Sequence, residues 1–116
     1  KRRTYDNVMP VLVSNTMQYV EEHLTEDISL EKLSHCLNYS SKYISVQFKR
    51  HTGLSLREYI LDQKIECSKR LLTAGSSVSD ACLGSGFSDY SNFIRSFKKK
   101  TGISPGRFGK GKISIQ

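Results

Sequence analysis

The positions of apolar residues predict a helix near the beginning of the chain and a longer helix in its middle. We expect the first from Val11 to Leu24 and the second from Ser55 to Thr73, with Gly75 after it as a stop. In each, apolar residues recur at spacings that fall on one face of a helix. The expected buried faces are Val13, Met17, Val20 and Leu24 in the first helix and Leu56, Ile60, Cys67 and Leu71 in the second.

A pattern that occurs twice predicts two further pairs of short helices. Residues 48–55 (FKRHTGLS) recur 49 positions later as residues 97–104 (FKKKTGIS). Upstream, residues 30–40 match residues 78–88 at a shift of 48, because one extra residue lies near Asp89 in the second copy. Two copies are too few for a solenoid, so the sequence indicates a duplicated supersecondary unit.

Each copy has the residue types of a helix-turn-helix unit. A short apolar pattern at helical spacing, Leu30/Leu33/Leu37 in one copy and Val78/Ala81/Cys82 in the other, ends at a residue that tolerates positive φ. A serine then offers an N-cap for the next helix, and a glycine stops that helix. The residues with these three roles are Asn38, Ser40 and Gly53 in the first copy and Gly86, Ser88 and Gly102 in the second.

The second helix of each unit is expected to bury two apolar residues four positions apart. These are Ile44 and Phe48 in the first unit and Phe93 and Phe97 in the second. The same stretches could also be interpreted as alternating strands. The serine caps upstream and the glycine stops downstream favour helices.

The patterns together predict an all-α fold of about seven helices, with two helix-turn-helix subdomains joined by a long linker helix. We expect a tail at 1–10, the first subdomain at 11–54, the linker helix at 55–75, the second subdomain at 76–108 and a flexible tail at 109–116. Capping boxes begin at Ser55 and Ser77, and Ser104 with Pro105 begins a last short turn. Residues 112–116 could instead pair as a strand.

The charge balance favours a polyanionic partner. Lys and Arg number 18 against 11 Asp and Glu, which gives a net charge of +7. Nucleic acid, an anionic membrane surface and an acidic protein all fit this excess. No apolar stretch approaches the length of a membrane span, and no signal-peptide pattern is present. We therefore expect a cytoplasmic location and no membrane partner.

The cysteines and histidines indicate neither a metal site nor a catalytic pair. Cys36, Cys67 and Cys82 form an odd set without C-x-x-C spacing, which disfavours a disulfide framework and suits a reducing cytoplasm. We expect each to be a small core or half-buried residue. No cofactor, metal or enzymatic activity is predicted.

Basic residues lie on the second helix of each unit, opposite the face expected to be buried. Both outward faces combine cations, hydroxyl groups and single apolar groups, and they lack carboxylates apart from Asp89 near the start of the second. Base recognition in the major groove of double-stranded DNA uses this mixture. The expected DNA-binding residues are Ser41, Lys42, Ser45, Val46, Lys49, Arg50, Tyr90, Ser91, Ile94, Arg95, Lys98 and Lys99.

These residues are expected to divide between bases and phosphates. Arg95 is the first candidate for a guanine contact and Lys42 the second, while Val46 and Ile94, expected to be exposed, suit thymine methyl groups. The cations toward the helix ends suit phosphates: Lys49, Arg50, Lys98 and Lys99. A linker helix of roughly 28 Å (about 1.5 Å per residue) is comparable to the ~34 Å between successive major grooves, so one chain is expected to occupy two adjacent groove segments.

From about Met9 to Phe108 the chain resembles the DNA-binding domain of AraC/XylS-type transcription regulators. The matching stretches are residues 28–33 (ISLEKL), 43–45 (YIS), 48–50 (FKR) and 52–53 (TG), Tyr59, residues 86–93 (GFSDYSNF), Arg95, and residues 97–99 (FKK) and 102–105 (GISP). The resemblance implies two helix-turn-helix units that bind asymmetric promoter sites. It also implies a regulator of the bacterial type, usually an activator that contacts RNA polymerase. It also implies an effector-binding or dimerisation domain outside this chain.

The chain departs from the family pattern at several places. Lys64 stands where arginine is usual, Ser68 and Cys82 where alanine is usual, and Phe108 is followed by glycine instead of arginine. Val46 occupies a position where polar residues that contact bases are frequent, so the first unit is expected to discriminate less sharply than the second.

Two other functions fit parts of the sequence. Alkylation-repair enzymes can carry similar domains, although the reactive cysteine or zinc cluster would have to lie outside this chain. A protein-binding module could use the same exposed helices. A steep salt dependence of binding would indicate DNA, because each neutralised phosphate releases counterions.

Overall fold

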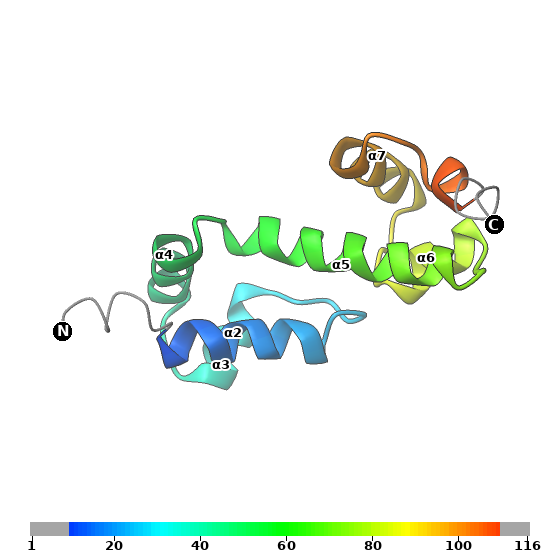
Figure 1. Cartoon of the computed structure of the whole chain (residues 1–116). Helices are drawn as coiled ribbons and strands as arrows, with labels where there is room; N and C mark the ends of the chain where they lie inside the picture. The colour runs from blue at the N-terminus through cyan, green and yellow to red at the C-terminus, as the bar shows by residue number, and fades with distance from the viewer. Residues whose placement is uncertain (1–9, 110–116) are drawn as a thin grey trace. The chain divides into compact units, whose positions relative to one another are not determined.

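The computed structural model describes residues 10–109, and this part of the chain is all-helical (Figure 1). Its helices are α2 (Val11–Glu22), α3 (Leu30–Leu37), α4 (Ser41–Thr52), α5 (Leu56–Thr73), α6 (Val78–Gly84) and α7 (Tyr90–Thr101), followed by a helical turn at 105–109. The predicted all-α fold is confirmed. The expected tails lie outside the described residues except for Pro10 and Gly109, and so does the strand considered at 112–116.

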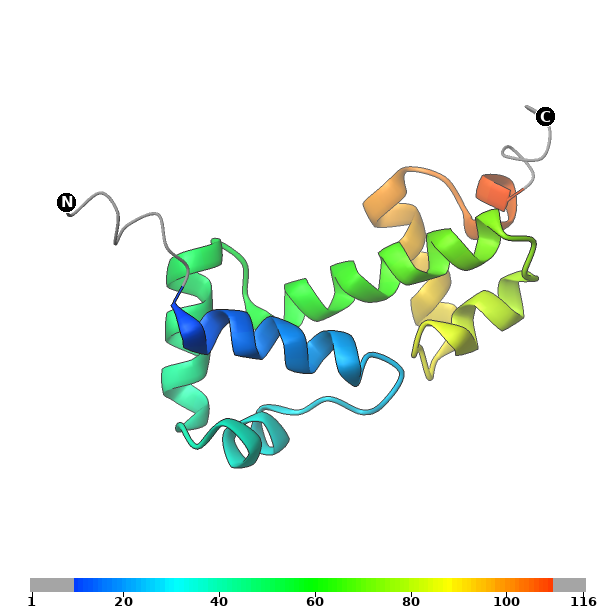
Figure 2. The ribbon, with the colours of Figure 1, turned by 60° about the horizontal axis from the view of Figure 1, so that its bottom comes forward.

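The described residues form two compact units. Within the described residues, unit 1 comprises 10–23 together with Asp27–Ile60, and unit 2 comprises Leu24–Glu26 together with 61–109. In unit 1, helices α2, α3 and α4 pack against one another, as both ribbon views show (Figures 1 and 2). In unit 2, α6 packs against α7, and the later part of α5 contributes to the same core.

The core of unit 1 confirms the predicted inner face of α4 and corrects that of α2. Ile44 and Phe48 are both buried, as expected. On α2 the buried residues are Val13, Thr16 and Val20, whereas Met17 is half-buried and Leu24 lies beyond the helix end. Thr16 is tolerated in the core because its Oγ1 donates a hydrogen bond to the Leu12 carbonyl at 2.8 Å.

Unit 2 repeats this arrangement on α5, where the predicted apolar stripe is partly wrong. The buried residues of this part of α5 are Ile65, Ser68 and Leu72, whereas Cys67 and Leu71 are only half-buried. Their spacing i, i+3, i+7 matches that of the buried residues of α2, with a hydroxyl residue in the middle of both sets. Ser68 donates to the Ile65 carbonyl at 2.7 Å. A buried serine counts as polar in a sequence pattern, which explains why the stripe was misplaced.

The turns before α4 and α7 have the predicted left-handed residues but differ in their caps. Asn38 and Gly86 have φ of 63° and 91°. Ser40 caps α4 by accepting from the Tyr43 amide at 3.1 Å, as predicted. The prediction for Ser88 is wrong, because Asp89 caps α7 by accepting from the Asn92 amide at 3.2 Å. The extra residue of the second copy moves the cap by one position, to a carboxylate that also suits the helix dipole.

Each unit also ends α4 or α7 with the same corner. Gly53 and Gly102 are left-handed caps, and the threonine before each glycine donates to the carbonyl four residues back, at 2.7 Å for Thr52 and 2.8 Å for Thr101. The next serine caps the following helix through the amides of Glu58 and Arg107. Aromatic rings then pack edge-on, Tyr59 on Phe48 at 5.2 Å and Phe108 on Phe97 at 5.4 Å. The duplication therefore extends to the first turn after each corner.

Candidate nucleic-acid interface

Helix α4 presents most of its predicted site residues to solvent because Ile44 and Phe48 hold its opposite side in the core of unit 1. Of the six predicted residues, two are partly buried and four are exposed. The Ser41 hydroxyl lies 3.4 Å from the Leu30 carbonyl and donates to it, which ties the start of α4 to α3. The partly buried residues are Ser41 and Ser45, and the exposed residues are Lys42, Val46, Lys49 and Arg50.

Helix α7 is oriented in unit 2 by Phe93 and Phe97, neither of which is exposed to solvent. Five of its six predicted site residues are exposed: Tyr90, Ser91, Arg95, Lys98 and Lys99. The expectation for Ile94 is wrong in one respect. Ile94 is half-buried and packs against the core of unit 2, because it lies on the flank of the helix next to Phe93.

Both helices carry a net positive charge, most of it near their C-terminal ends. Neither contains Asp or Glu, and each has three consecutive basic residues in its last turn, where cations interact favourably with the helix dipole. In α7 one of these is directed toward α5, since Lys100 Nζ lies 2.8 Å from Asp62 Oδ1. Lys98 and Lys99 remain on the exposed side of the helix.

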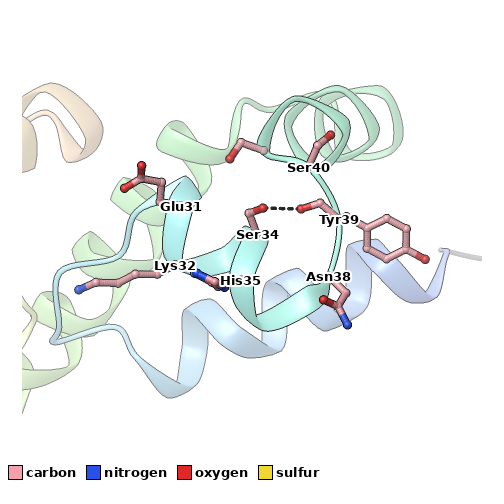
Figure 3. A pocket seen from close by; sticks show the side chains of 8 residues that line it. Glu31, Lys32, Ser34, His35, Asn38, Tyr39 and Ser40 are labelled. Carbon is pink, nitrogen blue, oxygen red and sulfur yellow. Dashed lines mark hydrogen bonds between the residues drawn. The ribbon is translucent and has the colours of Figure 1, made fainter.

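Sequence reasoning missed two exposed tyrosines at the start of α4. Tyr39 and Tyr43 are 48% and 47% exposed, and their rings stack with centroids 5.4 Å apart. Tyr39 borders a shallow pocket in which Ser34 donates to the Tyr39 carbonyl at 2.6 Å, while the Tyr39 ring points away from the pocket (Figure 3). Tyr39 precedes the N-cap of α4, so the helix period gives no signal for this pair.

A third missed residue is Asn92, which is exposed on α7 one turn before Ser96. The Ser96 hydroxyl lies 3.5 Å from Asn92 Oδ1 and donates to it. An asparagine amide suits the N6 and N7 atoms of adenine. Its position beside Ser91 places another polar group on the outward side of this helix.

A family model described as "Helix-turn-helix domain" matches residues 33–111 of the chain. The chain belongs to the AraC/XylS-type helix-turn-helix family. The HTH-type transcriptional regulator YobQ of Bacillus subtilis is 36% identical over 94 residues, which make up 78% of this chain. The chain spans 38% of the length of YobQ.

Solved structures support the same fold for this AraC/XylS-type chain. The C-terminal domain of AraT, a response regulator from Geobacillus stearothermophilus, is similar with a TM-score of 0.84 and 25% identity, covering 89% of this chain and 87% of that one. The DNA-binding domain of AdpA, solved in complex with a target DNA, has a TM-score of 0.83 at 22% identity, covering 90% of this chain and 95% of that one. The latter likeness shows the fold alone.

The departures expected from the family resemblance include Lys64 and Cys82, and both residues have defined contacts in unit 2. Lys64 Nζ donates to the Gly86 carbonyl at 2.9 Å and lies 5.9 Å from the centroid of the Phe87 ring, so it supports the turn of unit 2. The buried Cys82 Sγ donates to the Phe87 carbonyl at 3.8 Å. Burial raises the pKa of the Cys82 thiol, and the charge of Asp89 raises it further.

The remaining cysteines differ in exposure. Cys67 is half-buried, as predicted, but Cys36 is exposed, contrary to expectation. Burial also raises the pKa of the Tyr59 phenol, with a smaller contribution from Glu21.

None of the helices within residues 10–109 combines the length and the apolar character that a membrane-spanning segment needs. Over the same part of the chain, no group of three His, Cys, Asp or Glu side chains could hold a metal ion.

Proposed function

We propose that α4 and α7 bind double-stranded DNA sequence-specifically, each in the major groove, on adjacent segments of one duplex. The observation that carries this proposal is that α4 and α7, the second helices of the two units, share the same length, the same pattern of buried residues and an excess of cations. Each is a 12-residue helix with a side-chain N-cap, two buried anchors and no carboxylate of its own. A helix of this size fits the major groove, and its exposed cations and hydroxyl groups suit phosphates and base edges.

The predicted residues divide between two tasks in this proposal. Arg95 contacts guanine, and Lys42 is the second candidate for a base contact. The side chains of Ser41, Ser45, Val46, Tyr90 and Ser91 complete the base-facing set, and the exposed edge of Ile94 lies beside them. The cations near the helix ends bind phosphates and set the register of the helices on the duplex: Lys49, Arg50, Lys98 and Lys99.

The chain would then be the DNA-binding domain of a transcription regulator in the cytoplasm, with no catalytic activity of its own. The resemblance to AraC/XylS-type regulators supports activation through contact with RNA polymerase. It also supports an effector-binding or dimerisation domain elsewhere in the whole protein. AraT is a response regulator and the AdpA domain was solved in complex with a target DNA, and both are in line with these roles.

Selection of bound sequences from a random duplex pool tests the proposal. We expect an asymmetric site with two conserved segments about 10 base pairs apart, since that is one helical turn. Affinity for the recovered duplex should fall steeply with salt, by about 0.9 in log K per tenfold salt for each phosphate contact. A shuffled duplex of the same composition is the control. No enrichment together with a shallow salt slope would instead indicate a protein-binding module.

A further inference from the structure

The exposed side of α4 carries a shallow hollow. Its lining is Ser45, Val46, Lys49 and Arg50, and almost all of the lining surface is apolar. Val46 is 48% exposed, so its methyl groups are accessible to a partner. The long side chains of Lys49 and Arg50 have apolar stems and charged ends, which makes the hollow apolar at its base and cationic at its rim. We call it the α4 hollow.

The internal repeat places Val46 in register with Arg95. Phe48 and Phe97, which correspond in the repeat, are both buried, and Val46 and Arg95 each lie two positions before them. Both side chains are exposed on their helices. The same place on the two helices therefore holds a valine in unit 1 and a guanidinium in unit 2.

One ligand chemistry fits an apolar hollow with a cationic rim on a carboxylate-free helix. The C5-methyl group of thymine is the apolar group on the major-groove edge of the base pairs, and phosphates flank it on both strands. Ile94 is less accessible for such a contact than Val46, since it is half-buried and packs against the core of unit 2. We infer that the α4 hollow binds a thymine methyl group, so that unit 1 selects thymine at the place where Arg95 of unit 2 selects guanine.

This inference rests on the proposed function and can be tested separately from it. The probe is the duplex recovered by the random-pool selection, prepared with thymine or with uracil replacing thymine in one half-site at a time. Uracil lacks only the C5-methyl group. For the natural chain we expect uracil in the half-site contacted by α4 to weaken binding about fourfold per contacted methyl, as burial of one CH₂-sized group implies. Uracil in the other half-site should have a smaller effect.

The variant Val46→Ala assigns the effect to the hollow. In V46A the thymine-to-uracil change should have little effect, because the side chain that covers the methyl group is shortened. Val11→Ala is the matched control, since Val11 is also an exposed valine of unit 1, on α2, and is 72% exposed. V11A should keep the full uracil effect.

The outcomes distinguish the two proposals. A uracil effect that disappears in V46A and persists in V11A supports the α4 hollow as the thymine site. Specific binding without any uracil effect, or with an equal effect in V46A, overturns the inference and leaves the proposed function in place. Absence of sequence-specific binding in the selection overturns the proposed function itself.

Discussion

Units 1 and 2 have nearly the same internal framework but different exposed residues. Both contain a helix with a buried hydroxyl residue, Thr16 or Ser68, and both end the outward helix at a Thr-Gly corner. The exposed positions differ more, with valine in one helix where the other has Arg95. Burial and backbone geometry thus constrain the framework in both copies, whereas the exposed residues are free to differ in what they bind.

The sharpest difference within the framework lies at the turn before the outward helix. Unit 1 has Asn38 there, so a Cβ atom is accommodated despite a φ of 63°. In unit 2, a Cβ atom on Gly86 would lie 2.3 Å from the Leu24 carbonyl oxygen and 3.0 Å from the Thr25 Cα atom. The close approach of another backbone segment therefore makes glycine necessary in unit 2 but not in unit 1.

The largest expected effect is that of Gly86→Ala. We expect the free energy of unfolding to fall by about 2–5 kcal/mol, of which about 1–2 comes from the left-handed backbone and about 1–3 from overpacking against Leu24 and Thr25. Urea denaturation followed by circular dichroism measures this change.

Gly102→Ala is the matched control for this change. Gly102 has the same φ of 91°, but a Cβ atom there would meet no atom within 4 Å. We expect G102A to lose only the backbone contribution, about 1–2 kcal/mol. Equal losses in G86A and G102A would show that the approach of Leu24 contributes nothing to the requirement for glycine.

The next effect concerns the exposed residues. Arg95→Ala should weaken binding to the selected duplex by about 1–3 kcal/mol and relax the preference at one or two base pairs. The reason is that removal of the guanidinium leaves guanine O6 and N7 without their donor. Binding to a set of duplexes with one substitution each measures both quantities.

Lys99→Ala separates a base contact from a phosphate contact. It should weaken binding to all duplexes equally and reduce the salt slope by about 1, because a phosphate contact carries no sequence information. If R95A behaved in the same way, Arg95 would also be a phosphate contact, and the proposed difference in base selection between α4 and α7 would be lost.

The framework could be predicted from the sequence to the extent that its signals are local. Asn38, Gly53 and Gly102 have residue types that specify a backbone conformation, and the structure confirms them. The buried positions on α2 and α5 were predicted less well. Thr16 and Ser68 have polar side chains. They can be buried because a carbonyl of the same helix accepts a hydrogen bond from each hydroxyl group.

The candidate site shows the same limit. The exposed cations of α4 and α7 follow from the spacing of two buried anchors on each helix, so the sequence sufficed to place them. Ile94 was misplaced because its burial depends on how α7 meets the neighbouring core, which the helix period alone does not contain. Tyr39 lies before the N-cap of α4, and its stacking on Tyr43 depends on the geometry of the turn, which the helix period does not contain.

A smaller effect should compare the two N-caps. Asp89→Ala and Ser40→Ala each remove the acceptor for one amide of the first turn, at a cost of about 0.5–2 kcal/mol in the free energy of unfolding. Asp89→Ala should lower the free energy of unfolding more than Ser40→Ala, because the Asp89 carboxylate also interacts with the dipole of α7. The difference should shrink in high salt. Ser88→Ala is the control and should be close to neutral; a larger loss there would restore the serine as a cap.

The smallest effect concerns the ion pair that holds the end of α7 to α5. Lys100 and Asp62 are each 34% exposed, so their attraction is partly screened, and Asp62→Asn should lower the free energy of unfolding by less than about 1 kcal/mol. Glu66→Gln is the control on the same helix, since it removes a pair with Lys69 that spans only one turn of α5. The loss in D62N should exceed that in E66Q at low salt and approach it at high salt. Equal losses at every salt concentration would mean that the pair between α7 and α5 stabilises the fold no more than a pair within one turn of α5, so that the burial of Phe93 and Phe97 would be the main attachment of α7 to the core.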